Sequence, residues 1–401
     1  MLNLMRSCGH DGTHVLNLPP TPLADQFMTE PDSHAPAPRH ALGLRHCSTC
    51  TMVENVTFVD DDVLFGKDYA FFSGSSPALV NYFGLYADWL KQNFTDQLRH
   101  GIVEIASNDG TLLSHFKNNT HLGIDPAGPP SRSASDKGLN VENAPFTHRL
   151  AVTLPQNQLV VANNVVAHVA NLTDFLAGVA FIVGNSGRAV LEFQYLPDLL
   201  LGNQFDLVYH EHRRFLSLTA LQHSIKPHGL AIVDAMLTPT QGGSVRVVLA
   251  PSYAGIQKTT RAARLMDGEF DLYDVNTLRS FAVRVAHITT RLEMMMEELA
   301  TEGYDIGLYG APAKATTLVH AAGIAKHINY AVDLTDYKIG KYMPGTDIKI
   351  VTPSEENWRE DKADVYLLGI PNYLGSVIRR ERSFMVRGGK FLLPLPKPVI
   401  L

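Results

Sequence analysis

The feature that most constrains the fold is an alternation of short apolar β-type runs with helical runs, which starts near residue 101. The runs are GIVEIA (101–106), HLGID (121–125), NQLVVANNVV (157–166) and GRAVLEFQYL (187–196). Alternating strands and helices predict a parallel sheet that is covered on both faces. The next stretch, GLAIVDAMLTPTQGGSVRVVLAP, places two β-type runs around a Pro/Gly turn. It predicts an antiparallel hairpin that closes the sheet.

A second alternation follows a long helical stretch. Residues 255–302 carry an apolar stripe at helical spacing, and Gly303 marks the end of that helix. The strand–turn–helix rhythm then restarts in YDIGLYGAPAKATTLVHAAG and continues through INYAVDLT, ADVYLLGIP and GGKFLLPLP. We therefore predict an α/β protein with two tandem Rossmann-like, doubly wound domains. The predicted domains are residues 1–58, 59–252 and 253–401.

The first of these segments looks different from the rest. It holds all three cysteines of the chain, Cys8, Cys47 and Cys50, and shows little apolar periodicity, so a small core there needs a staple such as a metal ion. The two cysteines in CSTC have the spacing of one half of a zinc site. The matching half reads MRSC, with Met5 where a first cysteine belongs, and a thioether is a poor zinc ligand.

A fourth zinc ligand must therefore come from a histidine. The candidates are His10, His14 and His46, of which the first two are favoured, and three cysteines with one histidine form a recognised structural set. The alternative is that zinc is lost and the segment folds by packing alone.

Composition excludes several classes of protein. The net charge is −6 and no basic block is present, which argues against a nucleic-acid binder. No stretch approaches 18 uninterrupted apolar residues, so no membrane span is expected. Three cysteines cannot build a disulfide framework, and the N-terminus lacks the apolar segment of a secretion signal. We expect a cytoplasmic protein. The oligomeric state is not readable from the sequence.

The first stretch that could bind a ligand is VEIASNDGTLL (103–113), with Asp125 at the end of the next strand. A strand that enters a tight turn and then a helix leaves backbone N–H groups facing a ligand. Only Gly110 is a glycine, and Ala106 and Asn108 stand where a glycine-rich loop has others. The offset of Asp125 suits a carboxylate that accepts ribose hydroxyls. A plain βαβ turn without a ligand is the alternative.

The second stretch is DLVYHEHRRF (206–215), in which ionisable residues run consecutively after an apolar, strand-like pair. A solvated surface turn, a metal site and a proton-transfer site are all open. The metal site is disfavoured because His210 and His212, two residues apart, would lie on opposite sides of a strand. Histidine titrates near neutrality, which suits it to take and return a proton.

Six motifs, taken together and in this order, resemble one known family. They are VEIASNDGTLL, ANNVVAHVANLTDF, FDLVYHEHRRFLSL, QGGSVR, GLYGAPAKATTLVH and DYKIGKYMPGT. The chain resembles the S-adenosylmethionine-dependent sugar C-methyltransferases that act on dTDP-linked 4-keto-deoxyhexoses, and the resemblance covers nearly its whole length. It implies a zinc-binding N-terminal domain, a class I methyltransferase middle domain and a C-terminal Rossmann-like domain. It also implies methyl transfer to a ring carbon, C3, beside a ketone.

The resemblance assigns the cofactor site. It places Asp125 at the ribose, and it places His168 just below the residues that face the methionine part. His168 is equally readable as a packing histidine. The cofactor turn is assigned to Glu104, Ala106, Ser107, Asn108 and Gly110, and the methionine part to Asn163 and Asn164.

For catalysis, the resemblance implies His212 as the general base, with Glu211 and Tyr209 beside it. A proton next to the C4 ketone must leave, and the resulting enolate then attacks the methyl group. A donor must stabilise the enolate oxygen; Tyr209 is one candidate and Tyr69, in DYAFFSG, is another. His210 is expected to point away.

The motif QGGSVR departs from the family at its first position. Most relatives have histidine where this chain has Gln241. Glutamine donates a hydrogen bond but does not titrate. His212 is therefore a stronger candidate for the general base than it would be beside a histidine at position 241. No role is assigned to Arg213 and Arg214, which are read as solvated.

The C-terminal domain is expected to hold the nucleotide sugar. Gly310 and Lys314 form a strand–glycine–helix turn suited to a diphosphate, and Lys338 and Lys341 lie on a later Gly/Pro-rich loop. The alternative for each lysine is a solvated surface group, which is the usual place of a lysine. Two other functions remain open: a methyltransferase of the same fold with an oxygen or nitrogen acceptor, and a non-catalytic relative that binds a nucleotide sugar.

Overall fold

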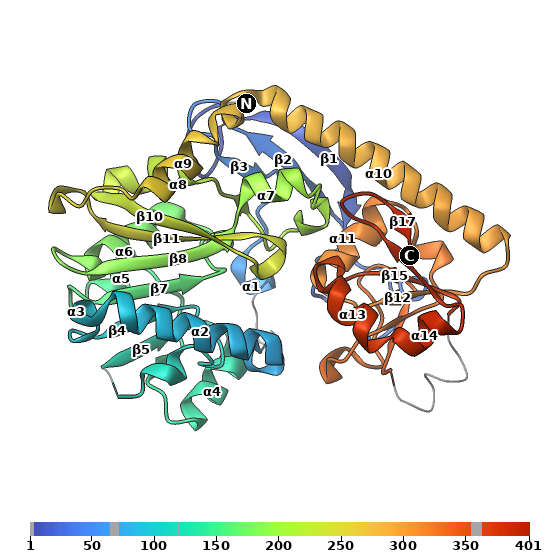
Figure 1. The fold of residues 1–401 in the computed structure, drawn as a ribbon, viewed down its shortest axis with the longest axis horizontal. Coiled ribbons are helices and arrows are strands. Elements are labelled where there is room, and N and C mark those ends of the chain that lie inside the picture. The colour runs from blue at the N-terminus through green and yellow to red at the C-terminus, as the bar shows by residue number, and fades with distance from the viewer. Residues whose placement is uncertain (1–3, 65–71, 119, 354–362) are drawn as a thin grey trace.

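The structure, a computed structural model, describes residues 4–64, 72–118, 120–353 and 363–401, and its strands form three sheets (Figure 1). The largest sheet has the order β10-β11-β8-β7-β4-β5-β6. Its strands are β4 (Ile102–Ile105), β5 (His121–Ile124), β6 (Val141–Glu142), β7 (Leu159–Asn163), β8 (Arg188–Gln194), β10 (Leu230–Thr238) and β11 (Ser244–Pro251). The strands from β6 to β8 are parallel, whereas β10 and β11 pair as the predicted antiparallel hairpin.

Helices cover both faces of this sheet, as the alternation predicts. Along β4 and β7, alternate residues enter different cores: Val103 and Val160 pack on one face, and Ile102 and Leu159 on the other. The first face is covered by α6 (Leu172–Val183) and α8 (Leu218–Ile225), and the second by α2 (Pro77–Asn93). Smaller helices are α1 (Asp61–Leu64), α3 (Thr95–Leu98), α4 (Gly128–Asp136), α5 (His148–Ala151), α7 (Leu196–Leu201) and α9 (Thr260–Asp267). The doubly wound architecture is confirmed.

The C-terminal sheet repeats the architecture. Its order is β14-β13-β12-β15-β16-β17, parallel except for the last pair. The strands are β12 (Ile306–Tyr309), β13 (Tyr330–Val332), β14 (Lys349–Val351), β15 (Val365–Leu368), β16 (Lys390–Leu393) and β17 (Val399–Ile400). One face packs on α10 (Val275–Thr301) and α11 (Ala313–Ala321), and the other on α13 (Leu374–Arg380) and α14 (Arg382–Val386). None of the described helices combines the length and apolar composition that a membrane crossing requires.

The third sheet belongs mainly to the N-terminal segment, and it lies between the other two (Figure 1). It comprises β1 (Thr13–Thr21), β2 (His40–His46) and β3 (Val53–Asn55), and β9 (Arg214–Phe215) joins its edge from the middle of the chain. Side chains of β1 and β2 share one apolar core with α10 and α11. The long helix α10 spans both halves of the molecule along its upper edge (Figure 1).

One local prediction was wrong. Residues 206–208 do not form a strand: Phe205–Leu207 is a 3₁₀ helix, and a turn at residues 209–211 follows it. The 3₁₀ helix packs against α11, and the hydroxyl of Thr317 on α11 donates to the carbonyl oxygen of Val208 over 3.4 Å. The YHEH residues (209–212) therefore lie in a turn between the large sheet and the C-terminal domain.

Candidate active site and zinc centre

The predicted cofactor turn lies at the carboxyl end of β4, where the strand order of the large sheet reverses and ligands bind in such folds. Ala106 and Asn108 have left-handed backbones, with φ of 56° and 53°. The Asn108 N–H donates to one oxygen of the Asp125 carboxylate and the Ala127 N–H to the other, each over 2.8 Å. The turn and the predicted ribose acceptor are therefore held together.

Several buried polar atoms at this edge have no partner in the described part of the chain. They are one carboxyl oxygen of Glu104, the hydroxyl of Ser107 and both side-chain polar atoms of Asn163. Burial, and then the charge of Asp125, raise the pKa of Glu104 well above its usual value. Orphaned donors and acceptors around a strand-end turn fit a polar ligand such as S-adenosylmethionine.

The segment before α2 closes over this turn. The N–H groups of Ser73 and Gly74 donate to the side chains of Asn108 (2.8 Å) and Asp109 (3.2 Å). The preceding residues, including Tyr69, lie outside the described ranges, so its proposed donor role stays a prediction.

The YHEH turn fixes the tautomers of two histidines. His212 Nδ1 lies 2.8 Å from the carbonyl oxygen of Leu207, so Nδ1 carries the proton and Nε2 is the acceptor. The hydroxyl of Tyr209 donates to that Nε2 over 2.9 Å. His168 likewise donates from Nδ1 to the carbonyl oxygen of Glu211 over 2.7 Å, and its ring centroid lies 4.9 Å from that of His212. The ANNVVAH and YHEH motifs thus meet in space.

Burial keeps both rings neutral. It lowers the pKa of His168 to about 4, and together with His168 it lowers the pKa of His212 to about 3. A neutral His212 has a lone pair on Nε2 at any physiological pH. A lowered pKa makes the ring a weak base, so it accepts a proton only when a developing negative charge beside it stabilises the imidazolium that forms.

His210 points away from this pair, as expected, although the reason is a turn and not strand alternation. It is buried against the N-terminal sheet, where its Nε2 donates to the carbonyl oxygen of Ala41 over 3.3 Å and its ring contacts His40 edge-on.

The interpretation of Arg213 and Arg214 as solvated was wrong, because both are fully buried. Arg213 donates to the carbonyl oxygens of His168 and Val59 and pairs with Asp61. Arg214 donates to the carbonyl oxygens of residues 169 and 170 and to the hydroxyl of Ser7. The two guanidinium groups tie the N-terminal segment to the loop that carries His168.

Three of the five candidate substrate-binding residues lie in or against the turn between β12 and α11. Gly310 has φ of +86°, and a Cβ there would meet Ile370 at 2.9 Å. Lys314 contacts Asn372, and burial lowers its pKa while the charge of Asp206 opposes the shift. Lys338 donates to the carbonyl oxygen of Ala311 over 3.0 Å.

The remaining two candidates are less enclosed. The ammonium of Lys341 lies 3.3 Å from the ring centroid of Tyr337. Gln241 is exposed in the β10–β11 turn, with φ of 53°. The adjacent Thr240 donates to Glu192 over 3.1 Å, so this turn touches a buried polar network.

That network was missed by the sequence analysis. Glu192, on β8, pairs with Arg246, on β11, over 2.9 Å, and the hydroxyl of Tyr82 contacts both partners. Glu192 lies directly opposite Asn163 in the sheet register. The two charges come from strands over 50 residues apart, and no local signal marks such a pair.

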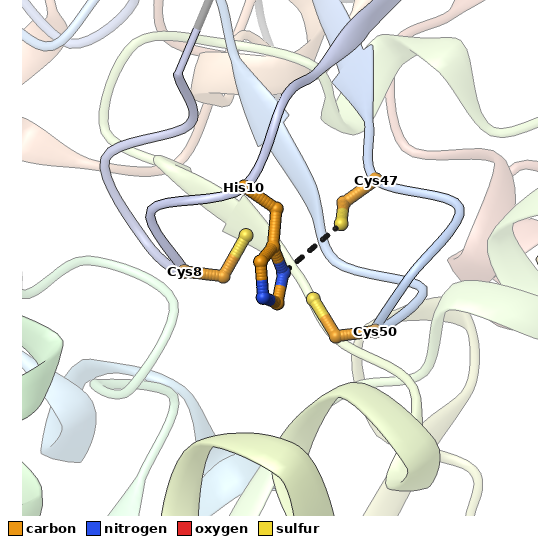
Figure 2. A group of neighbouring side chains, drawn as sticks. All are labelled: Cys8, His10, Cys47 and Cys50. Carbon is orange, nitrogen blue, oxygen red and sulfur yellow. Dashed lines mark hydrogen bonds between the residues drawn. The ribbon is translucent and has the colours of Figure 1, made fainter.

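The three cysteines gather with one histidine, as Figure 2 shows. The ligand atoms of Cys8, His10, Cys47 and Cys50 all lie within 4.8 Å of one another. His10 Nδ1 lies 3.5 Å from the Cys47 sulfur. Hydrogen bonding from Cys50 lowers the pKa of the Cys8 thiol to about 6. A set of three thiols and one imidazole fits structural zinc.

Among the three candidate histidines, His10 is the one that the structure places beside the cysteines. His46 instead donates from Nε2 to the carbonyl oxygen of Leu272 over 2.7 Å, and His14 is not in the cluster. Met5 is buried among apolar side chains. Glu54 stabilises the segment that precedes Cys8 by accepting hydrogen bonds from the N–H groups of Arg6 and Ser7.

We expect the purified protein to contain about one zinc ion per chain. His10→Ala should lose most of this zinc, because it leaves three ligands at a four-ligand site, whereas His14→Ala should keep it. Metal analysis after dialysis against a weak chelator measures the content. Equal zinc in the two variants would remove His10 from the ligand set.

Two family models match the chain. Residues 6–65 match a putative zinc binding domain, and residues 239–396 match a C-methyltransferase C-terminal domain. The chain is also 29% identical to the C-methyltransferase NovU of Streptomyces niveus over 406 residues, covering 99% of this chain and 96% of that protein.

Likenesses to solved structures are distant and cover about half of this chain. The PH0226 protein from Pyrococcus horikoshii OT3 matches with a TM-score of 0.37 and 14% identity, covering 49% of this chain and 100% of that one. Magnesium protoporphyrin IX methyltransferase from Synechocystis, with SAH bound, matches with a TM-score of 0.34 and 13% identity, covering 47% and 90%.

The zinc-binding match contains the four-residue cluster, and the C-methyltransferase match begins in the β10–β11 turn and runs through the C-terminal sheet. Both agree with the order of motifs along the sequence and with the relative that spans nearly the whole chain. The chain is therefore an S-adenosylmethionine-dependent C-methyltransferase with an N-terminal zinc-binding domain.

Proposed function

We propose that this enzyme methylates the carbon beside the ketone of a nucleotide-activated keto-deoxysugar, namely C3 of a dTDP-linked 4-keto-6-deoxyhexose. The observation that carries the proposal is the His212–Tyr209 pair, in which Nε2 is the acceptor and a phenol O–H donates to it. Forming a carbon nucleophile requires a base together with a donor for the enolate oxygen, and this pair supplies both.

The chemistry follows from the pair. His212 Nε2 takes the proton from the carbon beside the ketone, and the C–H electron pair becomes the C=C bond of an enolate. Tyr209 turns its O–H from Nε2 to the enolate oxygen. S-adenosylmethionine, when bound, supplies an electrophilic methyl group for that carbon. The ring of His168 lies tilted against that of His212, and burial of His212, with a smaller effect of His168, lowers the pKa of the base and keeps it neutral before the reaction.

The nucleotide part of the proposal rests on the C-terminal domain. The strand–glycine–helix turn at Gly310 lies beside Lys314 and Lys338, and backbone N–H groups with ammonium groups suit a diphosphate. The resemblance of the six motifs points to dTDP. A sugar bound with its diphosphate at this turn would reach toward the YHEH turn, because α11 packs against residues 205–207.

Solvent exchange tests the proposal. The enzyme, with S-adenosylhomocysteine and dTDP-4-keto-6-deoxyglucose in deuterated water, is expected to introduce deuterium at the carbon beside the ketone. With S-adenosylmethionine it should yield a product with a new C–C bond, seen by carbon NMR. Methylation without exchange would indicate an oxygen or nitrogen acceptor. A protein that neither methylates this sugar nor binds S-adenosylmethionine by calorimetry would be a non-catalytic relative.

A further inference from the structure

The loop between β1 and β2 (residues 22–39) lies along the loop between β13 and β14 (residues 333–348). Met28 and Tyr342 exchange two backbone hydrogen bonds, with nitrogen–oxygen distances of 3.0 Å and 2.8 Å. The first loop belongs to the zinc-binding domain, whereas the second carries Lys338. Main-chain pairing therefore joins the zinc-binding domain to the proposed nucleotide site.

Side-chain contacts hold the two loops close together. Arg39 donates to the carbonyl oxygen of Gly345 over 3.1 Å, and its guanidinium lies 3.3 Å from Nδ1 of His320. Gly345 has φ of +65°, and a Cβ there would meet Cγ of Pro22 at 2.7 Å. Backbone that approaches a neighbour this closely leaves no room for a side chain. The two loops are therefore fixed relative to each other.

This packing brings the ring of Phe27 to Lys338. The Lys338 ammonium lies 5.0 Å from the ring centroid, within the range of a cation–π interaction. The same ammonium donates to the carbonyl oxygen of Ala311 over 3.0 Å and lies 3.7 Å from a carboxyl oxygen of Asp333. Ala311 directly follows Gly310 in the strand–glycine–helix turn. A ring from one domain and two oxygen atoms from another thus hold Lys338 at that turn.

The ammonium of Lys338 still has donors to offer. It carries three N–H groups, and within the part of the chain that the structure describes only one of them has a hydrogen-bond acceptor, at Ala311. The Asp333 carboxylate is already engaged, since its oxygens accept from the N–H groups of Ala311 and Thr335, each over 2.9 Å. The Lys338 side chain is 16% exposed. A mostly enclosed cation with donors left over fits a phosphate group.

We propose that Phe27 is a positioning residue of the nucleotide-sugar site: its ring holds the Lys338 ammonium at the Gly310 turn, where the ammonium binds the diphosphate. The identity of that ligand rests on the proposed function. A lysine ammonium sits on a flexible stem of four carbons, and the ring face restricts where it lies. The zinc-binding domain therefore contributes to substrate binding through this ring.

Binding of dTDP to the whole, zinc-loaded enzyme tests the proposal. Phe27→Leu keeps apolar bulk but removes the π face, so its Kd for dTDP should rise about fivefold by calorimetry. Phe27→Tyr keeps the π face and should bind dTDP within about twofold of the wild type. In methylation assays Phe27→Leu should raise KM for the dTDP sugar more than it lowers kcat, because the lost contact acts on the nucleotide end of the substrate. An unchanged Kd in Phe27→Leu, or an equal loss in Phe27→Tyr, would overturn the proposal.

The placement of Lys338 can also be measured without a nucleotide. Acetic anhydride labels accessible amines, and peptide mass spectrometry gives the rate at each lysine. Phe27→Leu should raise the rate at Lys338 about threefold and leave that at Lys226, an exposed lysine after α8, unchanged. Tyr304→Leu is the matched control, because the Lys390 ammonium lies 4.4 Å from that ring centroid at the amino ends of the C-terminal strands. It should raise labelling at Lys390 and leave both Lys338 and dTDP binding unchanged.

The two measurements separate two kinds of failure. If the wild-type enzyme does not bind dTDP, the nucleotide part of the proposed function fails, and the labelling rate alone decides whether Phe27 positions Lys338. If that rate is the same in Phe27→Leu as in the wild type, the positioning role is wrong even where dTDP binds. Faster labelling of Lys338 together with weaker dTDP binding is the result that the proposal requires.

Discussion

His212→Asn is expected to lower the rate of methylation by about 10³-fold and to abolish exchange of the α proton with deuterated water. Asparagine can still donate to the carbonyl oxygen of Leu207, as His212 Nδ1 does over 2.8 Å, but it has no basic nitrogen. The turn should therefore keep its shape while the proton acceptor is lost. Exchange followed by proton NMR, with the substrate at saturation, measures the loss directly.

A matched control lies two residues away. His210 belongs to the same turn but faces the N-terminal sheet, so His210→Asn should retain exchange. S-adenosylmethionine should bind His212→Asn as tightly as the wild type by calorimetry, because the predicted cofactor residues are at β4, β5 and β7. Wild-type exchange in His212→Asn would exclude it as the base.

Much of the fold could be predicted because its signals are local. The β-type runs at 101–106 and 157–166 alternate between two cores along each strand, and Asp125 follows the cofactor turn at the expected offset. The zinc ligands were also predictable as a set. Which histidine completes it depends on the turn at residues 5–10, where the Gly9 N–H bonds to the Met5 carbonyl oxygen.

The features that the sequence did not predict depend on contacts between distant segments. Consecutive arginines at 213 and 214 read as solvated, but carbonyl oxygens from 168–170 and 59 meet their guanidinium groups. These carbonyl oxygens meet the arginines only in the folded chain, so no spacing of residues along the sequence predicts the contacts.

Arg246→Met is expected to lower the free energy of unfolding by about 3–5 kcal/mol, since it leaves the buried carboxylate of Glu192 without its cation. The Arg246 guanidinium also lies 3.5 Å from the ring centroid of Tyr86 and 4.8 Å from that of Trp89. Loss of this contact loosens α2, the helix that follows the segment closing over the cofactor turn. Urea unfolding followed by circular dichroism measures the change.

Two comparisons separate this mechanism from a general effect of losing an arginine. Arg261 pairs with Asp234 on β10, but its side chain is 52% exposed, so Arg261→Met should cost less than about 1 kcal/mol. The double variant Glu192→Leu with Arg246→Met removes both charges and should regain much of the loss, because an apolar pair of similar volume needs no partner. If the double variant is as unstable as the sum of the two single variants, the pair is not coupled, and the cost of Arg246→Met arises from lost aromatic packing instead.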